Sequence, residues 1–182
     1  MPNWCFNTLS VDGDASSIAK FREWLNDEPL TLQKIKPMPA ELEDTTSPTP
    51  KGQEEKAAML TEKYGASDWY TWHINNWGTK WDIEANEEEG SSDETNIMFW
   101  FDSAWAPPTN AIAELGKLFP NLSLRLNYRE DGCQFAGVMT VNGDEVFDDY
   151  YDANKDEEAY RAFMLEEYDE DPLAEQEEEE NE

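Results

Sequence analysis

Apolar and polar residues alternate most cleanly over residues 122–129. Leu122, Leu124, Leu126 and Tyr128 form one side of the alternation, and Ser123, Arg125, Asn127 and Arg129 form the other. A period of two residues predicts a strand with one buried face. Residues 97–105 begin with apolar side chains at successive positions, which favours a central strand buried on both faces. Asn142-Gly143 predicts a hairpin between strands over 135–141 and 144–147.

Three other segments carry apolar residues at helical spacing. The first follows a strand over 4–11, the second follows Pro107-Pro108, and the third lies near the C-terminus. Their apolar positions are Ile18, Phe21 and Leu25; Ile112, Leu115 and Phe119; and Tyr160, Phe163 and Met164. This spacing places the apolar side chains of each segment on one helix face.

Residues 27–68 interrupt the pattern with prolines and polar turns around one helical stretch, 53–64, and we interpret them as an excursion from the core. A further strand is expected where residues 77–82 leave an aromatic cluster. The predicted order is strand, helix, excursion, strand, strand, helix, strand, strand, strand. It favours an α+β ferredoxin-like fold: a split β-α-β antiparallel sheet with helices on one face, and an added C-terminal hairpin and helix. We expect one domain over 1–165 and an acidic, disordered tail over 166–182.

The most unusual property of the composition is the net charge. Among the 182 residues, 42 are acidic and 13 are basic, so the net charge is -29. Residues 166–182 hold 11 of the acids and no lysine or arginine, so the first 165 residues still carry -18. Such a chain repels nucleic acids and anionic membranes and attracts basic protein surfaces. The plainer interpretation of the charge is solubility.

Several short strings resemble the YubB-like family of phage, prophage and plasmid proteins. They are Met1-Pro2-Asn3-Trp4-Cys5 with Asn7, Pro37-Met38-Pro39, Asn76-Trp77-Gly78-Thr79-Lys80-Trp81-Asp82, Ala104-Trp105-Ala106-Pro107-Pro108, and Gly132 to Gly137. The resemblance covers about residues 1–150 and is weakest over 41–67. It implies a ferredoxin-like domain and a mobile-element origin. It implies no settled activity, so no catalytic residue is carried over.

Residues 69–82, WYTWHINNWGTKWD, hold four of the eight tryptophans. One interpretation is a structural cluster in the core, because buried tryptophan contributes a large apolar area and needs only a partner for its N–H. The other is an aromatic-lined cleft formed by Trp72, His73, Trp77, Lys80 and Trp105, bordered by Trp100. Lys80 would there bind a phosphate or carboxylate, or else simply pair with Asp82. His73 would form an acid–base pair with Asp82 or Asp102, or else be an ordinary packed histidine.

The sequence favours no metal and no cofactor. Cys5 and Cys133 lie far apart, His73 is the only histidine, and no CxxC occurs, so a zinc site of the usual kind is not expected. Residues 152–163 begin like a calcium loop but carry Glu157 and Phe163 where that loop needs glycine and glutamate. Neither cysteine has the surroundings of an activated thiol, and no glycine-rich phosphate loop is present. A non-enzymatic role is favoured, and catalysis is left open.

Two functions remain from this pattern. The first is an accessory protein of a phage or plasmid that binds a basic host protein, such as a DNA-binding or defence factor, as a DNA mimic or anti-defence factor. Its acidic face would comprise Asp148, Asp149, Asp152, Asp156, Glu157 and Glu158. The second is a small-ligand-binding protein or enzyme that uses the tryptophan cleft; a self-assembling structural component is a weaker third. With no apolar span and no secretory signal, we expect the cytoplasm of the bacterial host. Oligomeric state stays open.

Overall fold

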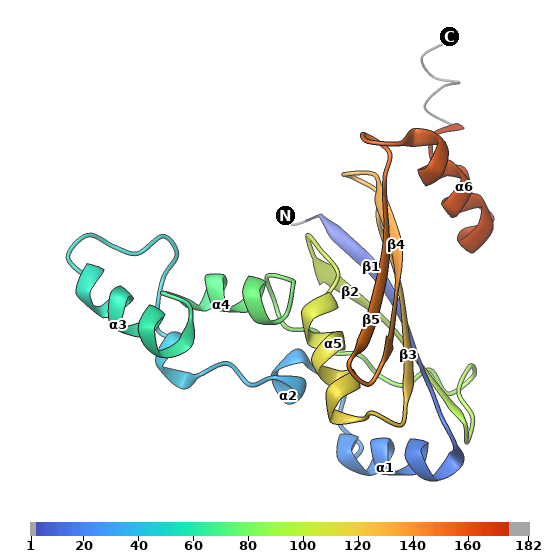
Figure 1. The fold of residues 1–182 in the computed structure, drawn as a ribbon, viewed down its shortest axis with the longest axis horizontal. Helices are drawn as coiled ribbons and strands as arrows, with labels where there is room; N and C mark the ends of the chain where they lie inside the picture. The colour runs from blue at the N-terminus through green and yellow to red at the C-terminus, as the bar shows by residue number, and fades with distance from the viewer. Residues whose placement is uncertain (1–2, 175–182) are drawn as a thin grey trace.

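The computed structural model describes residues 3–174, and its centre is an antiparallel sheet of five strands (Figure 1). In chain order the strands are β1 (Trp4–Asp12), β2 (Asn96–Ala104), β3 (Ser123–Glu130), β4 (Phe135–Asn142) and β5 (Glu145–Asp152). Their spatial order is β2-β1-β3-β4-β5, and every neighbouring pair is antiparallel. β2 is therefore an edge strand, and the prediction of a central strand over 97–105 buried on both faces is wrong, since Trp100 is 59% exposed. The hairpin predicted at Asn142-Gly143 is present, but its return strand continues to Asp152 rather than ending at Phe147.

The connection between β2 and β3 defines the fold. β1 lies between these two strands and runs antiparallel to both, so β2 and β3 run parallel to each other. Helix α5 (Thr109–Leu118) links them after Pro107-Pro108. The unit β2-α5-β3 is therefore a split β-α-β around β1, and the predicted α+β ferredoxin-like plan is confirmed.

The main core lies between the sheet and two helices on one of its faces, α1 (Ala15–Leu25) and α5. Phe21 of α1, Ile112 of α5, and Leu9 and Leu126 of the sheet are fully buried there. Burying a side chain of this size stabilises a fold by about 1.5–3 kcal/mol. Asp14 caps α1, because its carboxylate accepts a hydrogen bond from the Ser17 N–H at 3.0 Å.

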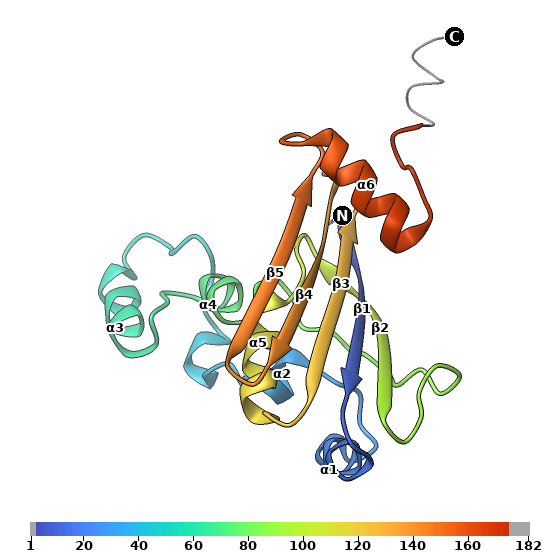
Figure 2. The same cartoon turned by 45° about the vertical axis from the view of Figure 1, so that its right-hand side comes forward.

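Helix α6 (Glu157–Tyr168) packs against the opposite face of the sheet, beside β4 and β5 (Figure 2). Phe163 stacks on Tyr151 of β5 with ring centroids 4.5 Å apart. The end of the helix is bound to β3, where Arg125 donates to Glu167 at 2.8 Å. This face is covered only in part, since outward-pointing aromatic side chains of β1 and β2 remain exposed.

The segment expected to be a disordered tail is partly packed. α6 continues to Tyr168, and Leu173 is buried at 8% exposure in a small cluster with Phe163 and Met164. Asp171 accepts a hydrogen bond from Arg161 at 2.7 Å. Residues 166–174 therefore belong to the folded part, because one apolar side chain and several carboxylates find partners on α6 and β3. The rest of the expected tail, 175–182, lies outside the described residues.

The excursion contains α2 (Leu32–Ile35), the 3-10 turn η1 (Ala40–Leu42), α3 (Glu54–Tyr64) and α4 (Trp69–Asn76). α3 and α4 form an arm that extends away from the sheet (Figure 1). The helical stretch expected over 53–64 corresponds to α3, and Gly65 ends it in the left-handed conformation. The excursion is thus longer than expected, since it includes the first part of the tryptophan cluster.

The strand expected after the tryptophan cluster does not form. Residues 69–76 are helical because Asp68 caps α4, accepting from the Thr71 N–H at 2.9 Å. Gly78, at φ +91°, follows the helix end. Beyond it the chain pairs only through isolated bridges, Leu30 with Ala85 and Glu87 with Phe99. The sheet accordingly has five strands where the sequence predicted six.

Candidate binding surfaces

The string around Trp77 anchors the arm to the rest of the fold. The Trp77 ring N–H donates to the Lys36 carbonyl oxygen at 2.9 Å, and the Thr79 hydroxyl donates to the Ala104 carbonyl oxygen at 2.8 Å. A side chain at Gly78 would come within 3.1 Å of the Pro107 carbonyl oxygen. These contacts give the NWGTKWD string a structural role.

Three of the five residues proposed to form the cleft lie in the interior. Trp72 and Trp77 are at most 5% exposed, and the His73 ring stacks on Trp77 with centroids 3.9 Å apart. His73 Nδ1 lies 2.8 Å from the Lys80 carbonyl oxygen, so a neutral ring donates there. Burial lowers the pKa of His73. The structural interpretation of these three aromatic rings therefore holds.

The proposed acid–base pairs of His73 do not form. Asp82 Oδ1 instead accepts from the backbone N–H groups of Leu32 at 2.6 Å and Ile83 at 2.9 Å. Asp102 lies on β2, in the outward-pointing register. Nε2 of His73 is buried and has no hydrogen-bond partner among the described residues. The ring is a packing element, as the plainer alternative expected.

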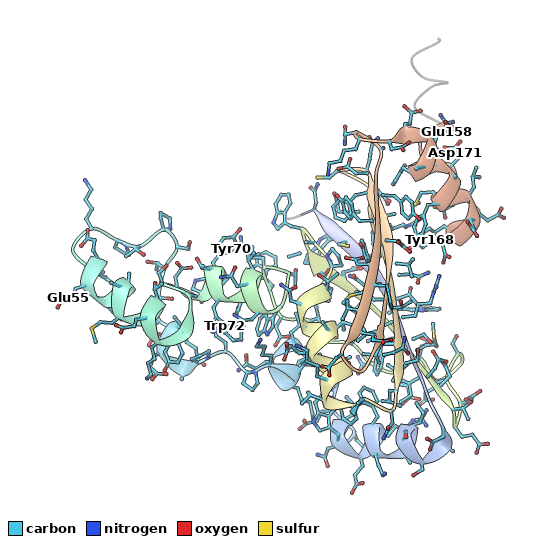
Figure 3. The ribbon with its side chains drawn as sticks, viewed as in Figure 1. Glu55, Tyr70, Trp72, Glu158, Tyr168 and Asp171 are labelled. Atoms are coloured by element: carbon cyan, nitrogen blue, oxygen red, sulfur yellow. The ribbon has the colours of Figure 1, made fainter. Side chains whose placement is uncertain are left out.

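Lys80 and Trp105 do come together, at a different site. With Ser47, Trp69 and Tyr70 they line a hollow of about 430 Å³. Figure 3 shows Tyr70 and Trp72 on opposite sides of α4, and their exposures are 38% and 5%. The Lys80 ammonium lies 5.1 Å from the Trp81 ring centroid and 5.9 Å from that of Tyr70. Trp105 is held at φ +71°, a conformation that bulky residues rarely adopt.

A second hollow, of about 260 Å³, lies on the uncovered part of the sheet beside α6. Phe6, Trp100, Asp102, Arg129 and Tyr168 contribute to its lining. The sequence pattern places Trp100 at the border of the other cleft and assigns Phe6 and Tyr168 to no site. The signal for Phe6 was the alternation in β1, where a buried cysteine and asparagine flank an exposed ring.

The six carboxylates of the proposed acidic face do not share one face. Asp148 pairs with Met139 and Asp149 with Val138 in the β4–β5 register, so these neighbours point to opposite sides of the sheet. Asp148 accepts a hydrogen bond from the Tyr128 hydroxyl at 2.7 Å. Burial of the Tyr128 ring is the larger cause of its raised pKa, and the Asp148 carboxylate is the second.

Three of the remaining four acids have structural partners. Asp152 lies 3.1 Å from the Lys155 ammonium, Asp156 caps α6, and Glu157 lies 3.2 Å from the Arg161 guanidinium. The proposed single acidic face is therefore wrong as a contiguous surface. Asp149 and Glu158 are its exposed members without such a role.

The cysteines do not have the character of nucleophiles. Burial raises the pKa of Cys5 to about 12. A hydrogen bond with Glu130 raises the pKa of exposed Cys133. Within residues 3–174, no group of three potential metal ligands comes together. No helix in the same part of the chain is long and apolar enough to cross a membrane.

These features define a ferredoxin-like α+β protein with two aromatic surface hollows. The profile of a family described as the ferredoxin-like domain in Api92-like protein matches residues 80–182, more than half of the chain. The chain belongs to this family. The crystal structure of protein Api92 from Yersinia pseudotuberculosis is similar at 13% identity and a TM-score of 0.52, over 83% of this chain and 98% of that chain. At this identity the likeness shows the fold alone. No curated protein matches the chain.

Proposed function

We propose that this chain is a non-enzymatic accessory protein of a phage or plasmid that binds a basic protein of the bacterial host. The partner would be a DNA-binding or defence factor, and the carboxylates of this chain would occupy positions that phosphates occupy in nucleic acid. The resemblance to YubB-like proteins supports the mobile-element origin. The cytoplasm of the host is the compartment where such a partner is met.

The observation that carries this proposal is that most of the basic residues are already paired with acidic residues of the same chain. Eight of the thirteen lysines and arginines already form salt bridges within the described residues. They are Arg22, Lys34, Lys63, Lys117, Arg125, Arg129, Lys155 and Arg161. The excess of acid, -29 for the chain, therefore has few internal cations left to neutralise it. Such a field steers basic partners toward the protein and repels nucleic acid.

Affinity capture from bacterial lysate tests the proposal. Full-length protein is immobilised beside a chain that ends at Ala174, because a cut at residue 165 would remove part of α6. We expect recovery of one basic, DNA-handling protein that is released by rising salt. Retention by the shortened chain would place the contact in residues 1–174, and loss would place it in residues 175–182.

A pair of double variants makes the capture specific for the acids of the β5–α6 region. Asp149→Asn with Glu158→Gln neutralises two exposed acids there, and Glu55→Gln with Glu62→Gln makes the same charge change on α3. Loss of capture in the first pair alone would support recognition through the β5–α6 region. Equal behaviour of the two pairs would count against a defined acidic contact.

The hollow at Lys80 supports an alternative function, binding of a small anionic ligand with an aromatic part. Lys80 forms no salt bridge with any described residue, and aromatic rings surround it. A screen of nucleotides and aromatic carboxylates by thermal shift tests this alternative. A ligand should raise the melting temperature of the wild type and leave Lys80→Met unchanged. No shift with any compound would remove this candidate.

A further inference from the structure

The uncovered half of the outer sheet face concentrates exposed aromatic rings. Trp4 and Phe6 of β1 are each 45% exposed, and Trp100 of β2 is 59% exposed. Their outward direction follows from the strand register, in which Thr8 pairs with Trp100 and Phe6 with Asp102. α6 packs mainly on β4 and β5 and leaves these rings exposed. An acidic, polar chain thus keeps large apolar rings in water at one place on its sheet.

The hollow on this face has the composition of an aromatic cage. Phe6 comes from β1, Trp100 from β2 and Tyr168 from the end of α6. The rest of the lining is Asn7, Thr8, Phe101, Asp102 and Arg129. Tyr168 lies at the end of α6 next to the sheet (Figure 3). Aromatic faces carry negative charge density, so rings that surround a small hollow attract a cation. Burial raises the Tyr168 pKa to about 12, so the ring stays a neutral phenol.

A guanidinium of the chain itself already occupies one wall of this hollow. Arg129 lies 5.9 Å from the Phe6 ring centroid and 5.0 Å from the Tyr168 ring centroid. Its charge is balanced by Glu170 and, at 3.9 Å, by Asp131. Arg129 and these two acids together carry a net charge of -1, so Arg129 does not make the wall positive. Its contacts also show that a planar guanidinium packs on these two rings.

The opposite side of the hollow carries a carboxylate that the described residues do not neutralise. Asp102 is exposed and forms no salt bridge between residues 3 and 174. It lies directly opposite Phe6 on the neighbouring strand and two residues from Trp100 on its own strand. An anionic guest such as a nucleic-acid phosphate would meet this charge and the -29 of the chain. A cationic guest would meet aromatic faces and one carboxylate together.

We infer that the hollow formed by Phe6, Trp100, Tyr168 and Asp102 binds an arginine side chain of a basic protein segment. Arginine fits better than lysine, because its planar guanidinium stacks on rings and donates two parallel hydrogen bonds to a carboxylate. The assignment of the guest to a basic partner protein rests on the proposed function. The inference adds the residues that would give that contact its specificity.

Titration calorimetry with full-length protein and a short glycine-serine peptide carrying consecutive arginines tests the inference. The same peptide with citrulline, which keeps the shape and loses the charge, should bind much more weakly. Phe6→Ala and Asp102→Asn should each weaken binding by about fivefold or more. Phe147→Ala on β5, on the same sheet face, and Glu62→Gln on α3 are matched controls, because both change exposed residues that lie outside the hollow. They should leave the affinity within about twofold.

Two results would overturn the inference. One is an equal loss of affinity in Asp102→Asn and Glu62→Gln, which would mean diffuse charge attraction. The other is binding of single-stranded RNA that Trp100→Ala abolishes, which would make the face a nucleic-acid surface. Because both exposed-residue variants of the cage retain the buried core, circular dichroism should show an unchanged fold. Cage-dependent peptide binding without capture of a basic host protein would overturn the proposed function and leave this site in place.

Discussion

Leu173→Ala is the substitution that most sharply tests the folded status of the C-terminal segment. Leu173 is 8% exposed and packs in a cluster whose other buried members are Ala136, Tyr160, Phe163 and Met164. Truncating a buried leucine to alanine costs about 2–5 kcal/mol. The cluster is small and lies near the end of the described chain, so it can partly collapse. We therefore expect the lower end of that range, about 2 kcal/mol.

Thermal and urea unfolding followed by circular dichroism measure this effect. For a chain of this length, about 2 kcal/mol corresponds to a fall in Tm of about 4–8 °C. Leu165→Ala is the matched control, since Leu165 lies on α6 but is 51% exposed. Its change should stay within about 0.5 kcal/mol of zero. If Leu173→Ala and Leu165→Ala melt together, residues 169–174 do not pack, and the cluster described above is wrong.

Three further predictions concern the arm and the sheet edge. Gly78→Ala should destabilise the fold by about 2 kcal/mol more than Gly52→Ala in urea titrations. Both glycines have positive φ, but a side chain at Gly78 would lie 3.1 Å from a carbonyl oxygen, whereas one at Gly52 would meet nothing within 4 Å. Equal losses of stability in the two variants would contradict the close approach at Gly78. Burial lowers the pKa of His73, so the unfolded chain binds more protons and the free energy of unfolding should fall as pH drops through about 6.5. His73→Phe should lose this part of the pH dependence. The same dependence of stability on pH in His73→Phe and the wild type would refute the prediction. Tyr128→Phe should lower the free energy of unfolding by about 1 kcal/mol in urea titrations, because it removes the hydrogen bond to Asp148. If neither Tyr128→Phe nor Asp148→Asn changed the free energy of unfolding, this prediction would be wrong.

Local patterns predicted most of the sheet. The alternation over 122–129 and the Asn142-Gly143 turn depend on backbone geometry and on burial of one face, and both are visible in the sequence. α4 was missed because tryptophan and tyrosine favour strands as a class. Its helical state depends on the Asp68 cap and on burial of Trp72 and Trp77 beneath it. These contacts are tertiary and leave no periodic signal in eight residues.

The candidate sites were harder to predict because they depend on strand register and length. Asp148 and Asp149 fall on opposite faces once β5 runs to Asp152, whereas a strand that ended at Phe147 left their directions undefined. The hollow beside α6 combines side chains from β1, β2, β3 and α6, and this helix begins more than fifty residues after the end of β2. Only the packed position of Tyr168 brings them together, and that residue fell in the expected tail.

Electrostatic recognition of a basic host protein is tested by the salt dependence of binding to the captured partner. The affinity of the full-length chain for that partner is measured at low salt and at about 1 M salt, where the Debye length shrinks to about 3 Å. Recognition of a basic surface by this acidic chain predicts a loss of affinity of about tenfold or more. An affinity that stays the same across the two salt concentrations would contradict electrostatic recognition of a basic partner.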